Sequence, residues 1–356
     1  MPNQVLYGFV NLKDVFSQRV EAVGVNVVNT AIDETLAEHN RQMAALTSLL
    51  VEQTTEYKVR YRTPGAARLQ PLDEQGRARP IKAAGYYDIA FPLQDAGTAW
   101  GQTYKASKKM TVQEANNVLS ALLVADKRWL ADHILAALFA STAWTFPDPD
   151  HGDLTIKGLA NGDTDSYLIQ AGADTGATDT HYLAQANAID NSNDPFGTLY
   201  SELMEHPENS GEVVAMISTG LKTAVQGLSA FYPQADPHLQ PGVATTTVRG
   251  TLGVPLPGTL LGYHEERVWI AEWKRLPANY IVAVATGGPR PVAMREEEEA
   301  SLRGFNRVAQ RDDHPYYESQ YLRTAGFGVQ NRVGAVAMRI GNGAWAVPTN
   351  YSSPMP

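Results

Sequence analysis

The chain has 356 residues, 44% of them hydrophobic and 19% charged, which is the composition of a folded protein large enough for two subdomains. It contains no cysteine, which excludes disulfides, thiolate catalysis and cysteine-ligated zinc or iron–sulfur centres. A net charge of −9 argues against a protein whose task is to grip the phosphates of a duplex. No stretch approaches the roughly eighteen apolar residues of a membrane span, and we expect no membrane association. The N-terminus lacks a basic segment followed by an apolar run, so no secretory signal is expected.

Residues 1–53 are predicted to form an N-terminal arm and a helix. Valines between Val20 and Val28 indicate a short extended piece. Asn29 or Thr30 can cap a helix that runs to about Gln53. Its apolar stripe consists of Leu36, Met43, Leu46 and Leu50. Because this helix is near the terminus, we expect it to lie on the surface of a neighbouring molecule.

Residues 54–110 change to a period of two, which predicts strands. Tyr57, Val59 and Tyr61 alternate with basic residues, and alternation returns from Tyr87 to Leu93 after a stretch rich in turn residues. This pattern predicts a long two-stranded excursion with a polar tip. An isolated hairpin is marginally stable in water, so it needs a surface to lie against.

The segment from Glu56 to Met110 is unusually basic. Its ten basic and five acidic residues give a charge of about +5, which leaves about −14 for the rest of the chain. This asymmetry favours contact between the basic segment and the acidic body of another copy. The alternative is a solvated loop with a chance excess of arginine.

Residues 111–141 predict one long helix, which we term the spine. Thr111 and Glu114 form a capping-box pattern, and apolar residues recur at the helical period without glycine or proline before Pro147. Such a helix is roughly 45 Å long. The alternative is an ordinary long core helix of an enzyme.

The segment after the spine is rich in loops. Asp148, Asp150, His151 and Asp153 resemble an oxygen-ligand calcium loop, but the glycine and terminal glutamate of an EF-hand are missing. Turn formation by Asp and Pro is the preferred explanation, and no metal site is assigned. A short helix is predicted near residues 195–206.

A second unit follows, with a buried strand over Glu212–Thr219 and a helix after it. Strands are predicted near 244–251, 266–273 and 280–286, and the apolar run of the last indicates a central strand buried on both faces. The four glutamates from residue 296 to 299 form either a solvated face or a partner for the basic hairpin of a neighbour. In the closing segment, Phe327 and Val329 and then Val336, Met338 and Ile340 alternate as strand partners.

No catalytic motif is present. The sequence has no phosphate loop, dinucleotide fingerprint, HExxH zinc motif or nucleophile elbow, and its eight histidines lack metal-ligand spacing. His133, beside apolar residues of the spine, is interpreted as a core or interface histidine. We predict no cofactor, no catalytic residue and no enzymatic activity.

The order of these parts resembles the major capsid proteins of tailed double-stranded DNA bacteriophages, which have the HK97-like fold. The resemblance covers nearly the whole chain but is one of architecture, with only loose residue patterns. It implies an α+β fold with an N-terminal arm and helix (1–53), an extended two-stranded loop (54–110), a peripheral domain with the spine helix (111–164 and 288–325) and an axial domain with the C-terminal tail (165–287 and 326–356). The closing segment QYLRTAGFGVQNRVGAVAMRIG is similar to the C-terminal strand pair of the family.

Two departures limit what the resemblance implies. Some members cross-link a lysine of the extended loop to an asparagine of a neighbour, helped by a glutamate. The late segment HPYYESQYLRTAGFG has no asparagine and only Glu318 as an acid, so cross-linking is not expected, although Lys58 and Lys82 lie on the loop. A charged helical extension that would act as a built-in scaffold is also missing, so a separate scaffolding protein is expected.

The function implied is a structural head protein that self-assembles through pentamers and hexamers into an icosahedral shell around phage double-stranded DNA, without sequence-specific binding. The expected location is the virion, after assembly in the host cytoplasm. A portal is an expected partner, and a decoration protein is a further candidate. The alternatives are an encapsulin-type nanocompartment shell and a two-domain enzyme with an unrecognised site. Arg60, Arg62, Arg77 and Arg79 are the first candidates for contact between subunits. The full candidate set is Lys58, Arg60, Arg62, Arg77, Arg79, Lys82, Glu296, Glu297, Glu298 and Glu299.

Overall fold

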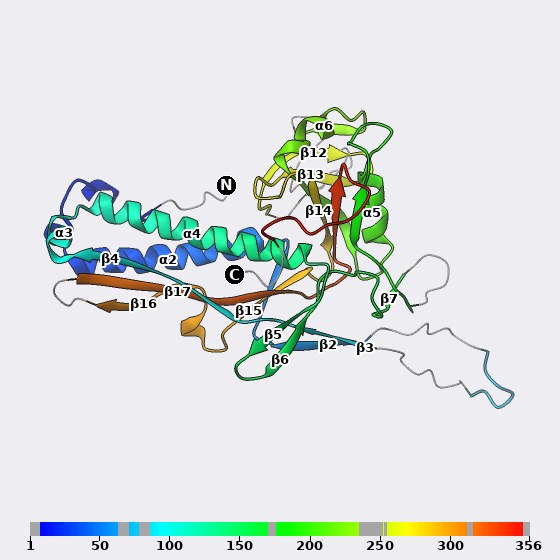
Figure 1. The fold of residues 1–356 in the computed structure, drawn as a ribbon, viewed down its shortest axis with the longest axis horizontal. Helices are drawn as coiled ribbons and strands as arrows, with labels where there is room; N and C mark the ends of the chain where they lie inside the picture. Colours follow the sequence, from blue (N-terminus) through cyan, green and yellow to red (C-terminus); the bar gives the residue numbers. More distant parts are fainter. Residues whose placement is uncertain are drawn as a thin grey trace.

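The computed structural model of the chain describes residues 8–62, 71–77, 86–169, 176–234, 252, 255–311 and 316–351. Figure 1 shows an elongated unit, in which two helices lie along a sheet, and a second unit built on another sheet. The helix α4 (Val112–Phe139) joins the two units.

Helix α4 is the predicted spine. Its capping box is present, with the Thr111 hydroxyl accepting from the Glu114 amide and the Glu114 carboxylate accepting from the Thr111 amide. The N-terminal half packs through Leu119 and Leu123 on the arm and helix α2 (Val25–Thr47), whereas the C-terminal half packs through Ile134 and Leu138 on the second sheet. One helix therefore contributes to two cores.

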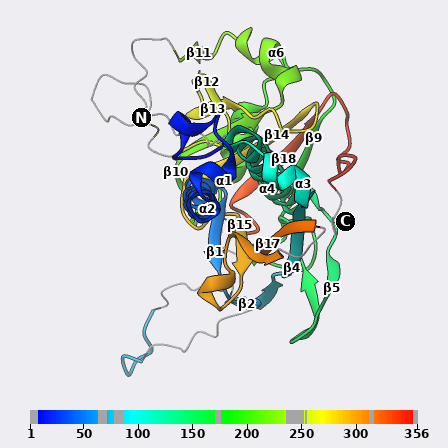
Figure 2. The same cartoon turned by 90° about the vertical axis from the view of Figure 1, so that its left-hand side faces the viewer.

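The elongated unit rests on a five-stranded sheet in which the long strand β17 (Tyr316–Val329) is central. Figure 2, viewed from the end, shows α2 and α4 side by side above it. The order is β1–β15–β17–β16, and β4 pairs with β17 along its other edge. The remaining strands are β1 (Val51–Thr54), β4 (Gln94–Thr103), β15 (Val292–Glu296) and β16 (Phe305–Arg311).

Close packing requires glycine in β17. A Cβ at Gly326 would lie 2.0 Å from the Pro92 carbonyl oxygen, so no larger residue fits there without movement of the backbone. This approach lets the chain cross from the hairpin into β4 directly over β17.

The second unit is a seven-stranded sheet of order β11–β12–β13–β10–β14–β18–β9. Neighbouring residues of its central strands point to opposite, equally buried faces: Val282 packs toward α4, and Ile281 packs toward helix α5 (Phe196–Met204). The strands are β9 (Tyr182–Gln185), β10 (Ser210–Ile217), β11 (Phe231–Pro233), β12 (Thr259–His264), β13 (Val268–Glu272), β14 (Tyr280–Gly287) and β18 (Ala335–Ile340). The predicted central strand at 280–286 is thus confirmed.

Three two-stranded hairpins and several short helices complete the described chain. The hairpins are β2 (Lys58–Arg62) with β3 (Tyr86–Ala90), β5 (Trp144–Asp148) with β6 (Gly152–Ile156), and β7 (Tyr167–Leu168) with β8 (Gly176–Ala177). The short helices are η1 (Lys13–Val15), α1 (Val20–Val23), α3 (Tyr104–Lys109), η2 (Thr219–Leu221), α6 (Lys222–Gln226) and η3 (Ala300–Leu302).

The N-terminal predictions need correction. The valine-rich stretch is helical, not extended, and the long helix begins at Val25 and ends at Thr47, so that residues 51–54 form β1 instead. The helix also does not keep its apolar stripe for a neighbour: Ile32 and Leu36 are buried within this chain. Tertiary contacts explain both differences, because β1 pairs with β15 and the apolar stripe of the helix packs on α4.

Two further predictions were wrong in part. The closing strands β17 and β18 are not partners, because they belong to different sheets. The expected helix after Thr219 is reduced to η2 and α6, because Gly227 ends it. The strand expected at 244–251 lies outside the described residues.

The smaller predictions agree with the structure. The expected short helix near 195–206 is α5. His133 is a buried core histidine whose Nδ1 donates to the Trp129 carbonyl, and burial lowers its pKa. Asp148 accepts from the amides of Asp150 and His151, as turn chemistry predicts, and pairs with buried Arg295 at 2.7 Å. Among the described residues, no helix is long and apolar enough to cross a membrane.

Candidate assembly surfaces

The strands of the β2–β3 hairpin lie below the two units in Figure 1 and are fixed to their own chain, whereas the described residues 71–77 lie far from both units. Ile89 and Phe91 are fully buried beside Ala293 of β15. The ring of Tyr57 stacks on His151 of the β5–β6 hairpin, with centroids 3.8 Å apart. This chain therefore supplies the supporting surface that the hairpin strands were predicted to need. The described residues 71–77 lie beyond that surface.

The basic residues of the hairpin are partly neutralised within it. Asp88 pairs with Lys58 at 2.8 Å and with Arg60 through two hydrogen bonds of 2.6 and 2.9 Å. The Arg60 guanidinium also lies 4.3 Å from the ring centre of Tyr86. The hydrogen bonds from Arg60 and then Lys58 hold the pKa of Asp88 far below its usual value. Because Lys58 and Arg60 share the single Asp88 carboxylate, these three side chains together keep one positive charge.

At the tip, Arg77 is exposed and lies in a turn. The Asp73 carboxylate accepts from the amide of Gln75 at 2.9 Å and from that of Arg77 at 2.7 Å, which fixes the turn by backbone contacts. Arg79 and Lys82 lie outside the described residues, as does the side chain of Arg62. Of the predicted arginines, Arg77 is thus the one placed with its side chain at the tip.

The glutamate run has two different parts. Glu296 is the last residue of β15 and is buried, which raises the pKa of its carboxyl group. Glu298 and Glu299 are exposed in the turn that follows, whose backbone is held by Arg303 through hydrogen bonds of 2.7 Å to the carbonyls of Glu297 and Glu298. Figures 1 and 2 show this turn well separated from the hairpin tip, so one chain does not bring the two charged segments together.

Sequence reasoning missed several residues of the candidate surface. Asp88 faces Arg60 in the register of the hairpin and sets its charge, and the opposite-charge pattern at paired strand positions was a usable signal. Three large hydrophobic side chains are also exposed on the hairpin and the long sheet: Tyr86 (63%), Val308 (49%) and Tyr316 (63%). Their exposure follows from strand pairing, which the sequence does not specify.

The fold is found in a phage protein. No protein-family model matches the sequence, and no curated protein matches it significantly. A chain from Mycobacterium phage Patience superposes with a TM-score of 0.68 at 20% identity, covering 99% of this chain and 98% of that one.

Two more distant solved structures are the asymmetric unit of the bacteriophage PhiM1 mature capsid and the capsid of cyanophage P-SCSP1u. The former has a TM-score of 0.49 at 10% identity and covers 82% of this chain and 85% of that one. The latter has a TM-score of 0.47 at 11% identity and covers 82% and 86%. The agreement over nearly the full length with the Patience chain confirms the predicted α+β, HK97-like fold.

Proposed function

We propose that this chain is the major capsid protein of a tailed double-stranded DNA bacteriophage. The observation that supports the proposal is the fold shared with a phage chain, in a superposition that covers 99% of this chain. The function is structural, and the working unit is a shell of many copies.

The geometry of the chain supports this role. A shell subunit needs a large contact area with several copies of itself, and projecting parts supply it. The β2–β3 hairpin projects from a fixed base, and its described tip carries Arg77 on an otherwise acidic chain of net charge −9. Glu298 and Glu299 offer acidic groups to such a tip from a neighbour.

The partners follow from this role. We infer pentamers and hexamers of this chain, a portal and a separate scaffolding protein, with a decoration protein as a further candidate partner. The enclosed double-stranded DNA is held without sequence-specific contacts. The acidic net charge suits a container filled by an external motor, because a wall that bound phosphates tightly would resist filling and release. The place of action is the virion, with assembly in the host cytoplasm.

An enzymatic role finds little support in the cavities of the described residues. One groove of about 570 Å³ lies between α2, α4 and the segment 256–275. Its walls are mainly apolar, with Leu46, Leu130 and Trp273 among them. Its charged lining residues are Lys127, Glu272, Lys274 and Arg275, and this set contains no nucleophile paired with a base.

The test is the mass of the particle formed by the full chain, measured by sedimentation and negative-stain imaging, with a co-expressed scaffolding candidate from the same genome. The proposal expects closed shells tens of nanometres across. Their content then separates the phage head from an encapsulin-type compartment, because the first encloses DNA and the second a protein cargo. A stable monomer or dimer with every scaffolding candidate would contradict the proposal.

A further inference from the structure

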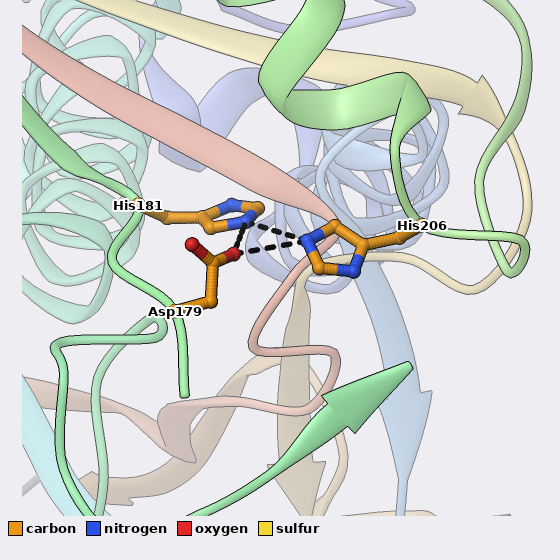
Figure 3. A group of neighbouring side chains, drawn as sticks. All are labelled: Asp179, His181 and His206. Atoms are coloured by element: carbon orange, nitrogen blue, oxygen red, sulfur yellow. Dashed lines mark hydrogen bonds and ion pairs between the residues drawn. The ribbon is translucent and has the colours of Figure 1, made fainter. Parts of the chain in front are cut away.

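Three ligand-type side chains meet at the edge of the seven-stranded sheet, apart from the surfaces described above. Figure 3 shows Asp179, His181 and His206 pointing toward one another. The first two precede β9, and His206 follows α5. The Asp179 Oδ2 atom lies 2.8 Å from His181 Nε2 and 3.0 Å from His206 Nε2, and the two Nε2 atoms are 3.1 Å apart. Both histidines are buried, with exposed fractions of 0% and 1%.

The outer hydrogen bonds fix the tautomer of both rings. His181 Nδ1 lies 2.7 Å from the Ala335 carbonyl oxygen, and His206 Nδ1 lies 2.9 Å from the Leu168 carbonyl oxygen. Because a carbonyl oxygen can only accept, each Nδ1 must carry the proton and donate it. In a neutral ring each Nε2 then presents a lone pair toward the centre of the cluster.

The centre of the cluster is therefore lined by acceptors. Two Nε2 lone pairs and a carboxylate oxygen face one another within 3.1 Å, an arrangement that requires a positive centre among them. A single proton lies well between only two of the three atoms, whereas a cation satisfies all three. Two more carboxylates add negative charge near the cluster and so favour a cation there. Oxygen atoms of Glu202 and Glu205 lie within 4.8 Å of the Asp179 carboxylate and of each other.

The spacing matches a transition-metal site. Ligand atoms about 2.0–2.1 Å from tetrahedral zinc lie about 3.3 Å from one another, a few tenths of an ångström more than the separations here. Metal-bound histidines usually donate their other ring N–H to a carbonyl or carboxylate, as both rings do in this cluster. Glu205 Oε1 lies 3.7 Å from His206 Nε2, but Glu205 does not come within 4.8 Å of all three cluster atoms. The described residues therefore supply three ligands, and the fourth position of a tetrahedral ion is left to a water molecule.

We propose that Asp179, His181 and His206 bind a divalent transition-metal ion of the zinc type, with a water molecule as the fourth ligand. The role of the ion is structural: it links segments that are distant in the sequence. Its ligands join the segment before β9 to the end of α5, and their outer hydrogen bonds reach β7 through Leu168 and β18 through Ala335. Four segments at one edge of the sheet are thereby held at one point.

The test is a titration of the full, untagged chain with Co²⁺ after treatment with a chelator. A tetrahedral site of two imidazoles, one carboxylate and a water molecule gives a visible absorption band that saturates near one equivalent per chain, and Zn²⁺ should displace it. The variants Asp179→Asn and His206→Gln should lose the band. His264→Gln is the matched control, because His264 is also buried but pairs with a single carboxylate, Asp194, at 2.7 Å.

Absence of a saturable band in the folded native chain would overturn the proposal and leave the cluster as a hydrogen-bonded imidazolium. Retention of native affinity in both ligand variants would also overturn it. If either variant fails to fold, by circular dichroism, the native chain still decides: Zn²⁺ should raise its unfolding temperature, and the increase should persist in the His264→Gln control.

Discussion

At the scale of single residues, one buried charge network holds the elongated unit together. Asp126 of α4 accepts two hydrogen bonds from the Arg323 guanidinium of β17 and lies 2.8 Å from His39 Nε2 of α2. Arg323 Nη2 also donates to Asn40 Oδ1 at 3.0 Å. Two helices and the central strand of the unit therefore meet at one carboxylate, which is 5% exposed.

Removal of that carboxylate should be strongly destabilising. We expect Asp126→Asn to lower the free energy of unfolding by about 3–5 kcal/mol, because Arg323 would remain buried without its counter-ion. Asp132→Asn, on the same helix, removes partly exposed ion pairs with Arg128 at 3.5 Å and Arg275 at 3.6 Å and should cost less than about 1 kcal/mol. Urea unfolding of both variants measures the difference, and equal losses would contradict the argument.

The same carboxylate predicts a pH dependence. Burial acts to raise the pKa of Asp126, but the hydrogen bond from His39 and the charge of Arg323 outweigh it and lower the pKa below its ordinary value. A depressed folded-state pKa means that this stability is present above the unfolded pKa of about 3.9 and is lost as pH falls through the folded value. From about pH 4 downward, the stability gap between the native chain and Asp126→Asn should thus narrow with falling pH. A gap that widens on acidification would contradict this.

This network shows why part of the structure could not be read from the sequence. The capping residues Thr111 and Glu114 are three positions apart, so a local pattern predicts them. Asp126 and Arg323 are separated by 197 positions, and nothing in the chain indicates that they meet. The histidine cluster is a second example, because His181 and His206 have no motif spacing and converge only through the sheet.

At the scale of elements, the boundary of the spine depends on its cap. The Thr111 hydroxyl accepts from the Glu114 amide at 3.2 Å, and the Glu114 carboxylate accepts from the Thr111 amide at 2.9 Å. We expect Thr111→Ala to cost about 1 kcal/mol of stability. Thr103→Ala is the matched control, because it caps only the short exposed α3 with a contact of 3.4 Å, and it should cost less. Thermal unfolding compares the two, and an equal loss would contradict the assignment.

Helices and strands that depend on residues close together in the sequence could be predicted, whereas those that depend on distant partners could not. The spine and the hairpin strands have strong periodic patterns and agree with the structure to within a few residues. Helix α2 was misplaced because residues 51–54 become a strand only through pairing with β15. The two closing strands were assigned to each other because adjacency in sequence favoured it, but β17 pairs with β15, β16 and β4, and β18 with β14 and β9.

At the scale of the whole molecule, the hairpin divides into a base that stabilises the chain and a tip that is available to others. Lys58 and Arg60 are engaged with Asp88, so reversing their charge would disturb the hairpin itself. Arg77 is exposed at the tip, where its charge is better suited to a contact between copies. The candidate contact residues thus separate into internal and external groups.

The external group supplies the last prediction. We expect the double variant Arg77→Glu and Arg79→Glu, which reverses the exposed Arg77 and the next arginine in the sequence, to remain folded and to assemble poorly. The physical reason is that charge reversal would turn the proposed attraction to a neighbour's acidic surface into repulsion. A loss of about 1.4 kcal/mol at each contact lowers its association constant about tenfold, and a shell multiplies this effect over many contacts.

The control is Arg41→Glu with Arg128→Glu, two helix residues whose side chains are each 71% exposed and whose reversal changes net charge equally. Sedimentation should find far fewer shells for the tip variant than for the control. Equal shell yields in both doubles, whether high or low, would show that the tip charges have no specific role in assembly.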